Sequence, residues 1–367
     1  MSKITLISPS FSGGGAERVM VTLANTFLDL GHLVDFIVLR DTGPYREMLS
    51  NRARKIVLYP VSSKGRIKGV IKSFFFMVRY LRRNQDRAIM STVRELNLFC
   101  VGANFLNLGR GKLFIREAAT LDRFFDKPSP SDRLIFILMK IFYNRAEGII
   151  ANSEETKKDL VEYLGLSPSK IKTIYNPLDL KSIRAEAENS KKTEHPSLVA
   201  CGRLVPMKNF EDAIRAVVKV REKYPNVILK IIGDGPHYDT LARMIRELQL
   251  EGTVELTGFL TAPFSEFACA HVFVQTSLWE GFGYVMPEAM ACGTPVVCFD
   301  SKGAMREILD KGRFGSLVPT GDITALANEI MRQLETPHPS YLLSEAVGRF
   351  DSKGIALQYL DALDVEE

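Results

Sequence analysis

The sequence predicts an α/β protein of two parallel-sheet domains. Its 367 residues exceed one typical domain. Apolar runs of strand type alternate with segments of helical period, and this pattern restarts after residue 196. Residues 1–175 carry 28 Lys/Arg against 16 Asp/Glu, whereas the remainder carries 20 against 27. The opposite charge balances indicate two domains with different surfaces.

Composition is that of an ordinary globular protein, with 46% apolar and 25% charged residues. No run approaches the length of a membrane span, and residues 1–7 are typical of a strand rather than of a signal peptide. The five cysteines form no C-x-x-C pair, which favours small buried thiols in a reducing compartment. We therefore expect a cytoplasmic protein.

In the first domain, a strand at 4–7 leads through a glycine-rich turn into a helix at 19–30 and a strand ending at 39. The turn, Ser12–Gly15, permits close approach of a phosphate or sugar. It is not G-x-G-x-x-G, so the dinucleotide fingerprint is missing. Further strands are expected at 112–115 and 148–153, and further helices at 132–143 and 154–164.

Residues 46–94 are strongly basic, with thirteen cations against two acids. They include an amphipathic helix at 67–83, for which two interpretations stay open. It is able to lie on an anionic membrane surface. Alternatively, its apolar residues form a core face with solvated cations opposite: Val70, Ile71, Phe74, Met77, Val78 and Leu81. Nucleic-acid binding is disfavoured because no recognition motif accompanies the charge.

After a polar segment expected to be an exposed hinge, 179–196, the second domain repeats the pattern. The expected strands are 198–201, 227–232, 254–260, 272–276 and 295–299. The expected helices are 213–220, 238–248, 264–269 and a helical end over 340–363.

Residues 279–298 are the most informative stretch. Gly281–Gly283 opens a short helix, Pro287 is tolerated in its first turn, and Gly293 ends it. Glu280 in the turn and Glu288 in the helix are thus able to face one ligand that carries phosphate and sugar hydroxyls. The alternative is that both glutamates are solvated helix charges.

The stretch from Glu280, E-G-F-G-x-x-x-P-E-A-M-A-C-G-T-P-V-V, resembles the signature of the retaining, nucleotide-sugar-dependent glycosyltransferases of family four. Two further segments are similar to that family: G-R-L-x-x-x-K-N at 202–209 and S-G-G-G-A-E-R at 12–18. The resemblance implies the GT-B fold, with two Rossmann-like parallel-sheet domains that face a cleft. Its expected parts are an acceptor domain (1–178), the hinge (179–196), a nucleotide-sugar domain (197–345) and a C-terminal helix (346–367) that packs back on the first domain.

The resemblance also implies roles for individual residues. Arg203 and Lys208 would hold the diphosphate, Glu288 the ribose, and Glu280 the transferred sugar. The expected donor-binding set is completed by Gly14, Gly15, Gly258, Phe259, Gly281, Phe282 and Gly283. No D-x-D occurs, so the cations are expected to replace a metal ion; neither a metal nor another cofactor is expected.

One departure concerns the acceptor side. Many family members carry a histidine after the strand near residue 115, yet no histidine lies between His32 and His195. Arg116 or Glu117 would take over part of that contact, and Glu117 is counted with Glu280, Arg203 and Lys208 as a catalytic candidate. The alternative is a structural salt bridge between Arg116 and Glu117.

The expected activity is therefore transfer of a hexose from a nucleotide diphosphate sugar, with uridine diphosphate favoured. The expected acceptor is a glycan or a lipid-linked glycan of bacterial surface polysaccharide, lipopolysaccharide or glycoprotein. Residues 46–94 would hold the enzyme on the inner face of the cytoplasmic membrane. The alternatives are a hydrolase or phosphorylase of the same fold and a non-catalytic sugar-binding module.

Overall fold

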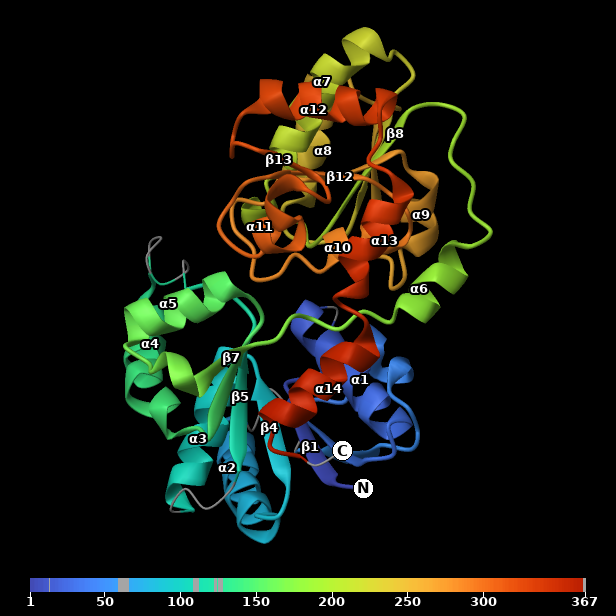
Figure 1. Ribbon diagram of the computed structural model, residues 1–367. Coiled ribbons are helices and arrows are strands. Elements are labelled where there is room, and N and C mark those ends of the chain that lie inside the picture. The colour runs from blue at the N-terminus through green and yellow to red at the C-terminus, as the bar shows by residue number, and fades with distance from the viewer. Residues whose placement is uncertain (13, 59–65, 108–111, 122–123, 125–127, 366–367) are drawn as a thin grey trace. The chain divides into compact units, whose positions relative to one another are not determined.

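The computed structural model describes residues 1–12, 14–58, 66–107, 112–121, 124 and 128–365 (Figure 1). By its contacts the chain divides into two compact units. Unit 1 comprises Met1–Leu178 and Ser352–Glu367, and unit 2 comprises Asp179–Asp351. Each unit has its own parallel sheet, so the predicted fold class is confirmed.

Unit 1 is built on a seven-stranded sheet of order β3-β2-β1-β4-β5-β6-β7. All of its strand pairs are parallel. The strands are β1 (Lys3–Ser8), β2 (Leu33–Val38), β3 (Arg54–Val57), β4 (Ala88–Thr92), β5 (Leu113–Glu117), β6 (Gly148–Ala151) and β7 (Ile171–Thr173). The sequence missed β3 and β4, because in the basic stretch the charge pattern obscures such short strands.

The helices of unit 1 are α1 (Gly15–Asp29), α2 (Arg66–Arg83), α3 (Arg94–Leu106), α4 (Pro130–Phe142), α5 (Glu154–Leu164) and α14 (Ser352–Ala362), with short 3-10 turns η1 (Pro44–Met48), η3 (Tyr143–Arg145) and η4 (Pro168–Lys170). Helices α2 to α5 share one apolar core with the sheet, and α2 contacts α3, which contacts α4. Helix α14 packs against α1. The prediction that the C-terminal helix returns to the first domain is therefore confirmed.

The core face predicted for α2 is correct at four of its six residues. Met77 and Leu81 are fully buried, and Phe74 and Val78 pack against the core. Val70 and Ile71, in contrast, are exposed.

Unit 2 is built on a six-stranded parallel sheet of order β10-β9-β8-β11-β12-β13. Its strands are β8 (Ser197–Cys201), β9 (Ile228–Ile232), β10 (Val254–Gly258), β11 (Val272–Gln275), β12 (Val296–Phe299) and β13 (Ser316–Val318). Its helices are α6 (Leu180–Ala187), α7 (Phe210–Lys223), α8 (Tyr238–Glu247), α9 (Phe264–Cys269), α10 (Val285–Ala291), α11 (Met305–Ile308), α12 (Ile323–Glu335) and α13 (Ser340–Gly348), with 3-10 turns η5 (Pro206–Lys208) and η6 (Asp310–Gly312).

Helix α6 lies in the segment for which the sequence predicts an exposed hinge. The Asp179 side chain caps it by accepting from the Ser182 amide at 3.0 Å. Leu180 and Ile183 are buried, and α6 contacts α9 and α10. The polar composition of 179–196 concealed this short helix, because only two of its residues face the core.

Candidate active site at the sheet edge of unit 2

The loops that follow β8, β9, β10 and β11 meet at one edge of the unit 2 sheet, because carboxyl ends of parallel strands share an edge. Two of these loops are tied together by the backbone. The Leu204 amide donates to the Asp234 carbonyl at 2.9 Å, and the His237 amide donates to Leu204 at 3.0 Å. A Cβ on Gly233 would lie 1.9 Å from the Gly202 carbonyl oxygen, so glycine is required for this approach.

Lys208 and Glu280 form an ion pair at this edge. Their side chains are 13% and 16% exposed, so the pair is shielded yet reachable from solvent. The Thr276 hydroxyl donates to the Lys208 carbonyl at 3.2 Å and so ties the loop that carries Lys208 to the end of β11. The predicted cation and the predicted sugar-binding acid are thus brought together.

The structure adds Gln275, which the sequence analysis missed. This side chain is 4% exposed at the end of β11 and donates to Glu280 Oε2 at 3.4 Å and to Ser277 Oγ at 3.2 Å. The sequence signal that could have found Gln275 is a glutamine at the end of an apolar strand, because a buried side-chain amide requires hydrogen-bond partners.

The backbone around Glu280 depends on two glycines. Gly283 has φ +72°, and a Cβ there would lie 3.3 Å from Glu280 Cγ. A Cβ on Gly303 would lie 1.8 Å from the Glu280 carbonyl oxygen, while the Glu280 amide donates to Lys302 at 3.0 Å. These contacts hold the Glu280 backbone in place from both sides.

Glu288 lies on α10 and is 1% exposed. Pro287 lies in the first turn of α10, and Gly293 follows its end with φ +78°, as predicted. Burial raises the pKa of the neighbouring Cys292 thiol to about 12, with a smaller contribution from the Glu288 charge. A buried carboxylate is costly without a specific role, so neither glutamate is a solvated helix charge.

The other predicted donor residues of unit 2 fall into two groups. Arg203 and Phe259 are exposed beside the Gly202 and Gly258 turns, and no described carboxylate pairs with Arg203. Phe282, in contrast, is 3% exposed and packs edge-on against Phe350 at 5.5 Å. At Gly281–Gly283, therefore, the backbone is the part able to meet a ligand.

In unit 1, Gly14 and Gly15 are exposed at the start of α1, and Gly13 of the same predicted loop lies outside the described residues. The carboxylate of Glu17 lies over this loop and accepts from Ser12 Oγ at 2.8 Å. A Cβ on Gly14 would lie 2.4 Å from Glu17 Oε2, so an alanine there would push Glu17 aside.

Arg116 and Glu117 are both buried and do not pair with each other. As neighbours in a strand they point to opposite faces. Glu117 is 2% exposed, with Arg94 Nε at 3.0 Å and the Tyr143 hydroxyl at 3.0 Å. Burial, followed by the Glu117 charge, holds the pKa of Tyr143 well above its usual value.

Arg116 is fully buried on the α14 side. Its Nε donates to the Tyr359 hydroxyl at 3.0 Å, and its remaining nitrogens donate to Thr92 and Asn176. The expected salt bridge between Arg116 and Glu117 is therefore wrong, because Glu117 pairs with Arg94 and Arg116 donates to neutral partners. The geometry of both residues favours structural roles.

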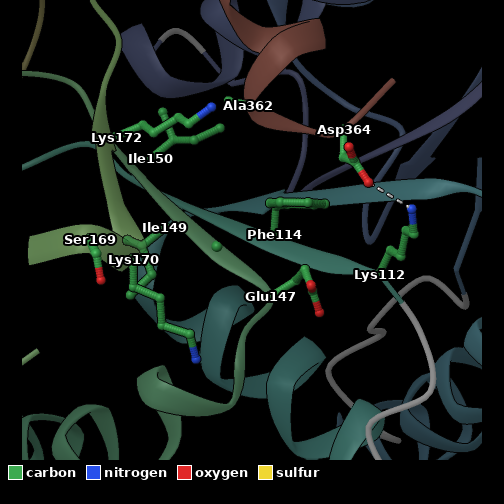
Figure 2. Close-up of a pocket in the computed structure, with 11 residues that line it drawn as sticks. Lys112, Phe114, Glu147, Ile149, Ile150, Ser169, Lys170, Lys172, Ala362 and Asp364 are labelled. Atoms are coloured by element: carbon green, nitrogen blue, oxygen red, sulfur yellow. Dashed lines mark hydrogen bonds and ion pairs between the residues drawn. The ribbon is translucent and has the colours of Figure 1, made fainter. Parts of the chain in front are cut away.

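A separate cavity of about 250 Å³ lies in unit 1 (Figure 2). Its lining includes Lys112, Lys170 and Lys172 and none of the predicted site residues. Lys112 pairs with Asp364 at 3.1 Å and Lys172 with Asp361 at 2.8 Å. Asp361 lies in the last turn of α14 and Asp364 follows the helix, so the cavity lies where the end of α14 packs against the sheet of unit 1. Within the described ranges, no group of three or more His, Cys, Asp or Glu residues is placed to hold a metal ion.

Two parallel α/β units, one with a lysine–glutamate pair at the carboxyl edge of its sheet, agree with the architecture that the sequence resemblance implies, that of GT-B glycosyltransferases. The family model for Glycosyltransferase Family 4 matches residues 13–182, and that for Glycosyl transferases group 1 matches residues 182–347. The chain belongs to this family of glycosyltransferases. The resemblance inferred from the sequence motifs is confirmed.

A curated relative from Campylobacter jejuni is N-acetylgalactosamine-N,N'-diacetylbacillosaminyl-diphospho-undecaprenol 4-alpha-N-acetylgalactosaminyltransferase. It is 28% identical over 341 residues, which cover 91% of each chain. Among solved structures, Anabaena Alr3699/HepE in complex with UDP-glucose has a TM-score of 0.80 at 23% identity and covers 99% of this chain and 100% of its own. The lipopolysaccharide outer core galactosyltransferase WaaB has a TM-score of 0.75 at 20% identity, covering 99% of each chain. These likenesses confirm the GT-B fold.

Proposed function

We propose that this glycosyltransferase moves a hexose-type sugar from a uridine diphosphate sugar to a glycan or lipid-linked glycan acceptor, with retention of configuration at C1. The observation that carries the proposal is the Lys208–Glu280 pair, partly accessible at the edge where α/β units bind ligands. An accessible cation next to a carboxylate offers one partner for phosphate and one for hydroxyls.

The pair also suggests how the donor enters. In the structure, Glu280 is the ion-pair partner of Lys208. A donor diphosphate would take over Lys208 together with the exposed Arg203, and this releases Glu280 to accept from the sugar hydroxyls. Glu288 would accept from the ribose hydroxyls, and the exposed Phe259 ring with the Gly258 backbone would meet the base.

In the reaction, the bond between sugar C1 and the diphosphate oxygen breaks and a bond from the acceptor oxygen to C1 forms on the same face. The acceptor proton passes to a phosphate oxygen, and nucleotide diphosphate leaves. Arg203 and Lys208 would stabilise the charge that develops on the leaving group, as fixed donors do in an oxyanion site. Metal independence is part of the proposal and predicts full activity in chelator.

The choice of donor and acceptor is supported by the relatives. The structures of Alr3699/HepE contain UDP, UDP-glucose, or UDP and glucose. The Campylobacter relative is named for an undecaprenol diphosphate-linked substrate, and WaaB for the lipopolysaccharide outer core. No described helix is long and apolar enough to cross a membrane. The lipid-linked substrate in the name of the Campylobacter relative supports a peripheral position at the inner face of the cytoplasmic membrane, which is part of the proposal.

The test is a thermal-shift screen of nucleotide sugars, followed by nucleotide release with and without acceptor. A true donor raises the melting temperature in proportion to occupancy. Release of nucleotide diphosphate that depends on acceptor supports the transferase. Release at the same rate without acceptor indicates a hydrolase, and stimulation by inorganic phosphate alone indicates a phosphorylase.

A further inference from the structure

The outer sides of α2, α3 and α4 expose large apolar side chains that the core does not use. On α2 these are Val70, Ile71 and Phe75; on α3, Phe105 and Leu106; on α4, Leu134, Ile137 and Ile141. Each is between 47% and 63% exposed. Scattered exposed apolar residues are normal, but eight on three neighbouring helices form a patch that marks an interaction surface.

Aromatic contacts hold the three helices that carry these residues against one another. Phe74, next to Phe75, packs edge-on against Phe99 of α3 at 5.3 Å. Phe105 of α3 packs against Phe142 of α4 at 6.4 Å. The three helices are adjacent and share their inner core, so their outer sides lie on one face of the unit. We call this surface the α2–α4 face.

The charges on this face are almost all positive. Ile71, Phe75, Arg79 and Arg82 follow one another along a single stripe of α2, at spacings of three and four residues. On α4, the stripe of Leu134, Ile137 and Ile141 is flanked by exposed Arg133 and Lys140. Helix α2 contains no acid, and the only acid of α4, Asp132, is buried in its N-terminal cap.

Other cations of the basic stretch behave differently. Arg54 and Arg87 pair with Asp35, Lys55 with Asp41, and Arg94 with Glu117. Lys64 lies outside the described residues. Arg79, Arg82 and Arg83, in contrast, pair with no carboxylate in the described part of the chain. The sequence therefore located the basic segment 46–94. Among the described residues, the structure limits its unpaired cations to the end of α2 and adds α3 and α4 to the exposed apolar surface.

We propose that the α2–α4 face docks on an anionic lipid bilayer. Its apolar residues would enter the boundary between headgroups and acyl chains, and its arginines and lysines would contact lipid phosphates. A bilayer is favoured over a protein partner because the exposed apolar side chains of all three helices combine with exposed cations on α2 and α4, whereas the exposed charge of α3 is Glu95 in its first turn. The proposal gives the proposed transferase its route to a lipid-linked acceptor, yet binding requires neither donor nor turnover.

Vesicle co-sedimentation of the full chain tests this with mixed phosphatidylglycerol and phosphatidylcholine, and with phosphatidylcholine alone. The parent should prefer the anionic vesicles and lose that preference at high salt. The triple variant Leu134→Gln, Ile137→Gln, Ile141→Gln should bind about tenfold to a hundredfold more weakly, because three partly exposed apolar side chains no longer insert. Arg79→Glu, Arg82→Glu, Arg83→Glu should bind at least about a hundredfold more weakly at low salt.

A matched control reverses three exposed cations of unit 2, Lys219→Glu, Arg243→Glu and Arg246→Glu, and should bind like the parent. Ile137→Trp supplies a readout that does not depend on the triple variants folding: its fluorescence should be quenched by brominated lipid. Binding by both triple variants equal to the parent, or no quenching at position 137, overturns the proposal. So does a stable dimer that the glutamine variant dissolves, because the occupant would then be a second copy of the chain.

Nucleotide release with a soluble acceptor analogue is measured on the same proteins and should be unchanged. If the parent binds vesicles but releases no nucleotide from any donor, the proposed function fails and the docking face stands. If the parent transfers sugar but does not bind vesicles, the docking proposal fails and the proposed function stands.

Discussion

Each unit has a glutamate at or after the carboxyl end of a strand that forms an ion pair with a basic residue: Glu117 at the end of β5 and Glu280 after β11. The two ion pairs differ in how deeply they are buried. Glu280 meets Lys208 where both side chains keep some exposure. Glu117 meets Arg94 where the side chains are 2% and 9% exposed, and Tyr143 closes the remaining side. Under the proposed function, a pair of opposite charges thus serves ligand exchange in unit 2 and cohesion in unit 1. What separates the two is whether a ligand is able to replace one partner.

The largest expected effect tests the buried pair. Arg94→Met leaves the Glu117 carboxylate with one neutral partner, so the free energy of unfolding should fall by about 3–5 kcal/mol. Denaturant titration measures it, with Arg246→Met on the exposed side of α8 as the control. A variant of unchanged stability that has lost turnover would reverse the assignment and return Glu117 to the acceptor side.

Lys208 of the Lys208–Glu280 pair and the neighbouring Arg203 should affect the reaction rate rather than folding. Lys208→Ala and Arg203→Ala should each lower turnover by about tenfold to a thousandfold, as loss of one preorganised donor does, while the melting temperature changes little. Lys219→Ala on α7 is the control. Parental turnover in both variants, or loss of activity in EDTA, would contradict the metal-free clamp.

Substitutions of Glu280 and of Glu288 should have different effects, one on turnover and the other on nucleotide binding. Glu288→Ala should weaken binding of nucleotide diphosphate by about tenfold to a hundredfold, because hydrogen bonds to a charged group are lost. Glu280→Gln should lose turnover yet bind nucleotide diphosphate at least as well as the parent, because Lys208 is released from its internal partner. Calorimetry with equal affinity loss in both variants would contradict this division.

Gln275 should have a smaller effect through its contact with Glu280. Gln275→Leu removes the donors to Glu280 and Ser277, so turnover should fall by about two- to tenfold at unchanged nucleotide affinity. Gln275→Glu is informative as well: a second carboxylate beside Glu280 should compete for Lys208 and lower turnover further. If both variants match the parent, Glu280 is held by Lys208 and its own backbone alone.

The smallest expected effect is a pH dependence of unit 2. Burial, followed by the charge of Arg332, lowers the pKa of His338 from its ordinary 6.5. As pH falls, the unfolded chain therefore protonates His338 before the folded chain does. The contribution of His338 to the free energy of unfolding is present above pH 6.5 and is lost as pH falls through 6.5 toward the folded pKa. His338→Asn should flatten the acid side of the unfolding free energy against pH. An unchanged profile would show that another group sets it.

Much of this arrangement was predictable, because hydrophobic period and glycine placement are local signals. The turn, helix and stop around Glu280, Pro287 and Gly293 needed only local sequence. The partners of Glu117 did not follow, because Arg94 and Tyr143 come from distant segments that the sheet topology brings together. The burial of Glu288 and of the Phe282 ring likewise depends on packing that no window of sequence contains.

The return of α14 to unit 1 has a consequence for synthesis on the ribosome. Unit 2 is inserted into unit 1, and the Ser352 amide donates to the Leu178 carbonyl at 2.9 Å where the two ends of the insertion meet. During translation, all of unit 2 emerges before Tyr359 reaches Arg116. The middle of the chain is therefore able to complete its fold first, while strand β5 of unit 1 still lacks its contact with the last helix. A chain truncated after Asp351 should leave the Arg116 guanidinium hydrated and accessible to protease attack nearby, with unit 2 intact.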